Sequence, residues 1–237
     1  PYDKSVLSEP KDNSQFSSLD HIIDYLELKK YDSLTVVACG PSANQLKNND
    51  NTLYLSTNRA IKLTNMYPFI YMVTDPFCLV DYIKNFKTVD NWKGTFFWYF
   101  TNEQKNRTTE IKMLKKYLKS NSREKREFLI TNTNQQHELQ SVHKEIINFC
   151  KQKMNIDYFG VNSGFQILVL GYLLAYKSNI PLKIYGLDLG EKEEAYFNRK
   201  VKLGKTIKSD FTKKKVSEFL DKIYGDRIID VQNFSYF

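Results

Sequence analysis

The sequence predicts an α/β fold in which a mostly parallel sheet carries helices on both faces, together with a small lid. Short apolar, β-branched runs alternate with helical patterns along the chain, the order typical of parallel sheets. The first run, residues 34–38, passes directly into a turn that contains Gly40. Residues 165–176 are apolar on every side of a helix, as expected for a helix buried against a sheet. These three features are typical of a Rossmann-like domain.

The predicted elements can be assigned in chain order. Ser17 and Asp20 resemble a capping box that begins an amphipathic helix ending near Lys30. The predicted strands cover residues 34–38, 53–56, 69–73, 95–100, 127–131, 182–185 and 227–231. Short helices are expected after Ser42 and Arg59, and longer helices at residues 107–119, 138–153, 165–176 and 216–224.

These elements divide the chain into four segments. Residues 1–32 form an N-terminal arm and helix, and residues 33–189 form the Rossmann-like domain, which we expect to bind a nucleotide. Residues 190–215 are polar and Lys-rich without apolar periodicity, which favours a lid or acceptor-binding segment. Residues 216–237 add a helix and a strand that complete the domain.

Composition indicates one folded domain with a small appendage. The chain has 237 residues, of which 41% are hydrophobic and 14% aromatic, so it can bury a core and is not disordered. Its three cysteines are widely spaced and match no metal or redox motif, and neither a signal peptide nor a long apolar run is present. We therefore expect a cytoplasmic protein without disulfides or a metal, and contact with the inner membrane, if any, to be peripheral.

The net charge of +8 favours an acidic partner. A nucleotide, a charged glycan and an anionic membrane surface all fit this charge, and so does a surface that is simply rich in solvated lysine. No base-stacking or recognition motif accompanies the charge, so we do not expect nucleic-acid binding. The composition leaves association into a homo-oligomer open.

Small polar residues follow several of the predicted strands. Cys39-Gly40-Pro41-Ser42, Asn58-Arg59, Asp75 and Gly186-Leu187-Asp188 each come directly after a strand. Ligands bind at this carboxyl edge of open parallel sheets. Ordinary turn chemistry accounts for any one of these residues, but their recurrence favours a binding site. Because the first turn has neither a Gly-x-Gly-x-x-Gly pattern nor a Walker lysine, dinucleotide binding is disfavoured and a P-loop is excluded.

The apolar helix begins with polar residues that suit an anion. Asn162 and Ser163, followed by Gly164, stand at its predicted N-terminus. Asn and Ser cap the free backbone N–H groups at such an end, which also carries partial positive charge. The sequence therefore predicts that a phosphate or carboxylate group of a ligand binds at this position.

The ordered set of these motifs resembles the bacterial sialyltransferases of glycosyltransferase family 42. The likeness extends over about residues 34 to 200 and includes Tyr196 after the last glycine turn. It implies a GT-A-like variant of the Rossmann-like domain that binds a CMP-activated sugar without a metal or other cofactor. The sugar would be sialic acid, a related nonulosonate or Kdo, and the acceptor a surface glycan of lipooligosaccharide or capsule biosynthesis. More distantly, the motifs resemble the pterin pyrophosphokinase and flagellin-glycosylation group, which gives the alternative function.

The resemblance also implies a set of residues that bind the nucleotide of the donor. This set is Cys39, Gly40, Pro41, Ser42, Asn58, Arg59, Asn162, Ser163, Gly164, Gly186, Leu187 and Tyr196. Three positions depart from the family pattern, which has Asn at Cys39, Asn at Asp75 and Thr at Asn162. Arg59, Arg199 and the lysines of residues 190–215 are candidates to stabilise the departing phosphate.

The general base is the main departure from the family. That family uses a lid histidine to deprotonate the acceptor hydroxyl, and residues 189–237 contain no histidine. A carboxylate can replace it, with Asp75 as the first candidate and Asp188 as another among the acidic residues near the site. Without a base, the chain would be an inactive module that binds a nucleotide or a glycan.

Overall fold

Within the residues that the structure describes, the chain forms a six-stranded sheet in which every neighbouring pair of strands is parallel. The computed structural model describes residues 18–47, 49, 51–64, 67–73, 94–98, 141–156, 163–188, 194–196, 199–202 and 210–234. The strands are β1 (Ser33–Val37), β2 (Thr52–Thr57), β3 (Phe69–Val73), β4 (Gly94–Trp98), β5 (Leu182–Tyr185) and β8 (Ile229–Phe234). Their spatial order is β4-β3-β2-β1-β5-β8. This arrangement confirms the predicted Rossmann-like α/β fold.

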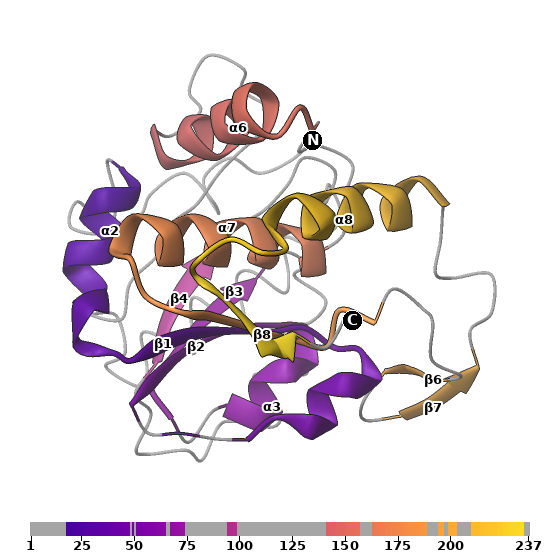
Figure 1. Cartoon of the computed structure of the whole chain (residues 1–237). Helices are drawn as coiled ribbons and strands as arrows, with labels where there is room; N and C mark the ends of the chain where they lie inside the picture. Colours follow the sequence, from indigo (N-terminus) through magenta and orange to yellow (C-terminus); the bar gives the residue numbers. More distant parts are fainter. Residues whose placement is uncertain are drawn as a thin grey trace, which may run out of the picture.

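The strand order reverses between β1 and β5. The chain moves outward from β1 to β4 and then returns to place β5 on the other side of β1. Because parallel crossovers are right-handed, the two halves place their helices on opposite faces of the sheet. Accordingly, α7 (Ser163–Ser178) and α8 (Asp210–Ile223) cover one face, and α3 (Ile61–Thr64) lies on the other (Figure 1). The prediction that the sheet carries helices on both faces is therefore confirmed.

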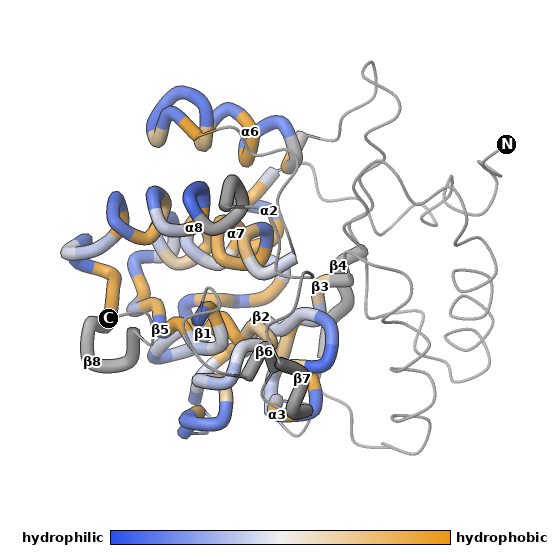
Figure 2. Tube along the Cα trace, turned by 90° about the vertical axis from the view of Figure 1, so that its right-hand side faces the viewer, coloured by the Kyte–Doolittle hydropathy of each residue, from blue (hydrophilic) through white to orange (hydrophobic). Residues whose placement is uncertain are grey.

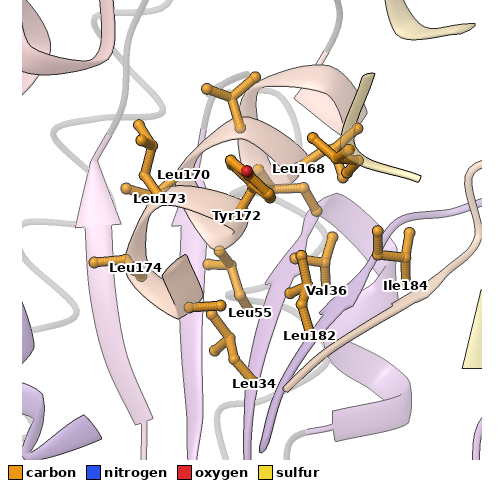
Figure 3. Close-up of a cluster of buried hydrophobic side chains, with 14 of the residues drawn as sticks. Leu34, Val36, Leu55, Leu168, Leu170, Tyr172, Leu173, Leu174, Leu182 and Ile184 are labelled. Atoms are coloured by element: carbon orange, nitrogen blue, oxygen red, sulfur yellow. The ribbon is translucent and has the colours of Figure 1, made fainter. Parts of the chain in front are cut away.

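Helix α7 is the centre of the hydrophobic core, as predicted. Every residue from Phe165 to Ala175 is buried, and only Tyr176 of its large hydrophobic residues is exposed. On one side α7 packs on β1, β2 and β5, and Figure 3 shows its leucines above the strand residues Val36 and Leu55. On its other sides lie α2 (Leu19–Leu26), α6 (Ser141–Lys153) and α8. These surroundings explain why the helix has no polar face.

Aromatic contacts hold α8 against α7. Phe219 packs edge-on against both Phe165 and Tyr172, with each pair of ring centroids 5.7 Å apart. The Tyr172 hydroxyl donates a hydrogen bond of 2.8 Å to Asp226, just beyond the end of α8. Burial and this hydrogen bond raise the pKa of Tyr172. These contacts fix the position of α8 along the length of α7.

Several predicted boundaries were wrong by a short distance. Helix α2 is capped by Ser18 rather than Ser17, since the Ser18 hydroxyl accepts from the backbone N–H of His21 at 3.1 Å. It ends at Leu26 rather than near Lys30, because Glu27 adopts the left-handed conformation and a 3-10 turn, η1 (Leu28–Lys30), follows.

The C-terminal boundaries also differ from the prediction. Helix α8 begins at Asp210, ahead of the predicted residue 216, because its lysine-rich first turns favour a helix although they show no apolar pattern. The last strand covers Ile229–Phe234 rather than residues 227–231. Asp226 holds a turn there, accepting from the backbone N–H groups of Ile228 and Ile229. The predicted strand at residues 127–131 and helix at residues 107–119 lie outside the described residues.

Hydropathy follows the layers of the fold. Figure 2 shows hydrophobic residues along α7 and the central strands, and mostly hydrophilic residues on the outer turns of α6 and α8. Among the helices that the structure describes, none combines the length and the apolar character needed to cross a membrane.

Candidate functional site

The turns after β1 and β5 meet at the carboxyl edge of the sheet. The backbone N–H of Gly40 donates to the carbonyl of Gly186 at 2.8 Å, and that of Ala38 donates to Tyr185 at 2.9 Å. A Cβ on Gly40 would lie 2.6 Å from the Gly186 carbonyl oxygen. Gly186 has a positive φ of 76°, and a Cβ there would lie 2.2 Å from the Ala38 carbonyl oxygen. Only glycine allows the two turns to come this close.

A buried hydrogen-bond network locks the two turns together. Asp188 Oδ2 accepts from the backbone N–H of Ser42 at 3.0 Å and from its hydroxyl at 2.9 Å. The same Ser42 hydroxyl oxygen accepts from the backbone N–H of Gly186 at 2.9 Å. Ser42 and Asp188 are only 3% and 6% exposed, respectively. Ser42 lies in the 3-10 helix η2 (Pro41–Gln45), so the network fixes the start of this helix against the end of β5.

The end of β2 is tied to the same edge. The Cys39 thiol donates to the carbonyl of Thr57 at 3.5 Å, and the Thr57 hydroxyl donates to the carbonyl of Met72 at the end of β3. Asn58 follows with a positive φ of 51°, and it begins the short 3-10 helix η3 (Asn58–Ala60), which includes the half-buried Arg59. The predicted site residues of β1 and β2 are therefore brought together.

Two buried oxygen atoms at this edge accept no hydrogen bond within the described part of the chain. They are Asn58 Oδ1 and Asp188 Oδ1. A buried acceptor without a donor costs about 1–3 kcal/mol, so a water molecule or a ligand usually supplies the missing donor. Their position after β2 and β5 is consistent with a site for a ligand that carries hydrogen-bond donors.

The N-terminus of α7 reaches the same edge. A Cβ on Gly171 would lie 2.3 Å from Val36 Cγ2, so α7 crosses β1 at this pair of residues. Going back along α7 from Gly171 to Ser163 covers about 12 Å at 1.5 Å per residue. Going forward from Val36 to Gly40 covers about 13 Å of extended chain. Because α7 runs antiparallel to β1, Ser163 and Gly164 end level with the Gly40 turn.

A small hairpin lies next to the first turn. It consists of β6 (Glu194–Tyr196) and β7 (Arg199–Lys202), which pair antiparallel with Tyr196 opposite Arg199. Strand β6 lies beside η2. The predicted lid segment therefore contains a hairpin at the site, and it ends in the first turns of α8.

Three other predicted site residues either lie outside the described residues or are buried in the core. Asp75 and Asn162 lie outside the described residues, so their roles stay predictions. Leu187 is buried in the core at 6% exposure, so only its backbone is available to a ligand. Within the ranges that the structure describes, no three metal-ligating side chains come together.

Sequence reasoning missed two features of this region. The hydrogen bonds between Ser42 and Asp188 join residues far apart in the chain, and nothing in the sequence pairs them. Lys215, treated as one of many lid lysines, is buried at 7% exposure. Its position four residues before the buried Phe219 of α8 was the available signal.

Comparison of the chain with models of protein families, with curated proteins and with solved structures finds no significant match.

Proposed function

We propose that this chain is a glycosyltransferase that moves sialic acid or a related acidic sugar, such as another nonulosonate or Kdo, from a CMP donor to a surface glycan. The observation that carries the proposal is the locked approach of the Gly40 and Gly186 turns. This approach lies where the strand order reverses, between β1 and β5, which is the usual ligand position in such sheets.

The charge of the donor suits the surroundings of this edge. A CMP-linked acidic sugar carries a phosphate and a carboxylate, whereas the chain has a net charge of +8. The N-terminus of α7, with Ser163 and Gly164, supplies backbone N–H groups and partial positive charge for an anion. Such groups can stabilise the departing phosphate without a metal.

The two candidate carboxylates take different roles in this proposal. Asp188 uses Oδ2 to hold Ser42 and is 6% exposed, so we assign it the positioning of the β1 turn rather than proton transfer. Asp75 is our candidate for the general base, because it comes two residues after β3 in the sequence and β3 ends at the same edge of the sheet. It would accept the proton of the acceptor hydroxyl as the acceptor oxygen bonds to the anomeric carbon and the bond from that carbon to the CMP phosphate oxygen breaks.

The proposal is tested by thermal unfolding with CMP, UMP, GDP, ATP and NAD, each with EDTA and with magnesium. A nucleotide that binds the native state raises the melting temperature by mass action. We expect a shift with CMP that is unchanged by EDTA, and slow release of CMP from a CMP-linked acidic sugar. A shift with ATP alone would favour the pyrophosphokinase-like alternative. A CMP shift without any turnover of donor, with or without a glycan acceptor, would indicate a binding module.

A further inference from the structure

The two carboxylate oxygens of Asp188 are used differently by the fold. Oδ2 accepts from the backbone N–H and the hydroxyl of Ser42, at 3.0 and 2.9 Å. Oδ1 is buried and accepts no hydrogen bond within the described part of the chain, and the residue as a whole is only 6% exposed. Because burial has removed this oxygen from bulk water, it needs a hydrogen-bond donor from a group that binds beside it.

Asn58 provides a second oxygen of this kind on the other side of β1. Its side-chain Oδ1 is also buried and has no donor among the described residues. The carbonyl of the preceding Thr57 accepts from the Cys39 thiol, whereas Asp188 accepts from Ser42, so the two acceptors flank the turn that joins β1 to η2. Since β2 and β5 are the two neighbours of β1, their ends lie about 10 Å apart, twice the spacing of adjacent strands.

The charge of Asp188 selects what can bind between these acceptors. A carboxylate accepts hydrogen bonds and repels the phosphate and carboxylate groups of a CMP-linked acidic sugar. Of the uncharged parts of a nucleotide, the ribose carries two neighbouring hydroxyl groups, and each of them can donate. A carboxylate that binds a ribose hydroxyl also recurs in nucleotide sites at the carboxyl edge of parallel sheets. Two acceptors that flank one turn therefore match the two hydroxyls of one ribose.

From this arrangement we propose that Asp188 determines specificity for ribose, accepting through Oδ1 a hydrogen bond from one ribose hydroxyl, while Asn58 Oδ1 accepts from the neighbouring hydroxyl. The inference rests on the proposed function for the identity of the nucleotide, CMP. It gives the two oxygens of Asp188 separate tasks, since Oδ2 fixes the turn after β1 and Oδ1 binds the ligand. A ribonucleotide is thereby distinguished from a deoxyribonucleotide.

The test is calorimetric titration of the full chain with CMP, with its 2′-deoxy and 3′-deoxy analogues, and with UMP. An analogue without the hydroxyl leaves a buried acceptor unpaired, which typically weakens binding about 10- to 100-fold for a charged acceptor and about 3- to 10-fold for a neutral one. We expect the wild type to bind one analogue more weakly than CMP by the larger factor, through Asp188. The other analogue should bind more weakly by the smaller factor, through Asn58.

Two variants assign the hydroxyls to the residues. Asp188→Asn keeps an oxygen that can accept from Ser42 and places an amide nitrogen where Oδ1 stands. Its discrimination against the first analogue should fall to about 3- to 10-fold, because a neutral hydrogen bond has about half the strength of a charge-assisted one. Asn58→Gly suits the positive φ of 51° at this position and removes the second acceptor, so discrimination against the second analogue should be lost.

The matched control is Asp226→Asn, which removes the same charge from another hydrogen-bonded carboxylate. Asp226 accepts from Tyr172 beyond the C-terminal end of α8 and immediately before β8, away from the carboxyl edge of the sheet. This variant should keep the discrimination of the wild type against both analogues within about twofold, as expected for a distant site.

Equal affinity of the wild type for CMP and both deoxy analogues would overturn the proposal and assign the missing donors to water molecules. This outcome needs no variant, so it decides the question even if Asp188→Asn does not fold. Discrimination that Asp188→Asn leaves unchanged would remove Asp188 from the ligand site. Weak binding of UMP, which lacks the amino group of cytosine, together with full binding of both deoxy analogues would assign the two acceptors to the base and contradict the ribose contact.

The same titrations separate this inference from the proposed function. If the wild type ignores CMP but binds ATP or GDP, the sugar-transfer function fails, and the ribose contact is then tested with the deoxy forms of that nucleotide. If the wild type binds CMP but turns over no CMP-linked sugar, transfer fails, and the deoxy analogues of CMP still decide the ribose contact. If the wild type binds no nucleotide, the ribose contact fails as well.

Discussion

Gly40, Gly186 and Gly225 are glycines for different physical reasons. Gly40 has an ordinary φ of −68°, and only the atoms around it exclude a side chain. Gly225 has a positive φ of 83° with no atom near its absent Cβ, so only its backbone conformation favours glycine. Gly186 combines both reasons. The close approach of the β1 and β5 turns therefore depends on sterics at Gly40 and on sterics and conformation at Gly186.

Because the atoms around Gly40 leave no room for a side chain, we predict that Gly40→Ala strongly lowers the stability of the fold. The new Cβ would lie 2.2 Å from Asp188 Oδ2 and 2.6 Å from the Gly186 carbonyl oxygen. We expect a loss of about 3 kcal/mol in the free energy of unfolding, at the upper end of overpacking costs, together with weaker binding of CMP. The matched variant Gly225→Ala should cost about 1–2 kcal/mol through its backbone alone and leave CMP binding unchanged. Urea denaturation and calorimetry measure both quantities.

A Gly40→Ala variant as stable as Gly225→Ala, with normal affinity for CMP, would contradict this interpretation of the turn. It would mean that the β1 and β5 turns separate easily and that their contact does not shape the site.

The contact between α7 and β1 sets the height of the helix above the sheet. Gly171 faces Val36, and the absence of a side chain lets the helix approach the strand closely. Leu55 of β2 is the next nearest neighbour of the absent Cβ, at 3.4 Å. This contact also determines where along β1 the N-terminus of α7 ends, so a packing residue in the core positions the candidate anion site.

Gly171→Ala should therefore destabilise the chain although alanine is the better helix former. Alanine gains about 1 kcal/mol of helix propensity over glycine, but its Cβ would lie 2.3 Å from Val36 Cγ2. Overpacking of this kind costs about 1–3 kcal/mol, so we expect a net loss of stability.

A double-mutant cycle with Val36→Ala tests the cause of this loss. Val36→Ala alone should cost about 2 kcal/mol through the cavity that it leaves. In the double variant the new methyl group fills part of that cavity, so the total loss should be smaller than the sum of the two single losses by about 1 kcal/mol. Additive losses in chemical denaturation would show that Gly171 and Val36 do not restrict each other.

At the scale of the whole molecule, the net charge of +8 suits a nucleotide and a nucleic acid alike, and the effect of salt on binding distinguishes the two. A small anion held at one edge of the sheet makes few charge contacts, partly shielded from salt. A polynucleotide bound along a basic surface releases many counterions, and its affinity falls about 10³-fold or more between 50 and 200 mM salt.

We therefore expect CMP affinity to fall only about two- to threefold over this range of salt concentration, because the proposed contacts lie at the buried edge of the sheet. A random single-stranded oligonucleotide should bind weakly at 50 mM salt and not measurably at 200 mM. Fluorescence anisotropy and calorimetry give the two curves. Oligonucleotide binding that persists at 200 mM salt would shift the interpretation to a nucleic-acid partner.

Local patterns in the sequence predicted the elements whose apolar residues form a clear run or a regular pattern. Strand β3 covers the predicted residues 69–73, and α7 is buried as its uniform apolar composition indicated. Boundaries failed where a single side chain or backbone angle decides them, as at Ser18 and Glu27. The start of α8 was missed because helical lysine has no periodic signature, and the burial of Lys215 was missed with it.

By itself, the sequence determined the α/β class, the buried α7 and the glycine turns that follow β1 and β5. Each of these depends on residues close together in the chain, where propensity and hydrophobic periodicity act. Only the tertiary structure decided that the Gly40 and Gly186 turns touch, that Asp188 holds Ser42, and that Lys215 is buried. These contacts join residues far apart in the chain, and their partners are chosen by strand order and helix packing, which no local pattern encodes.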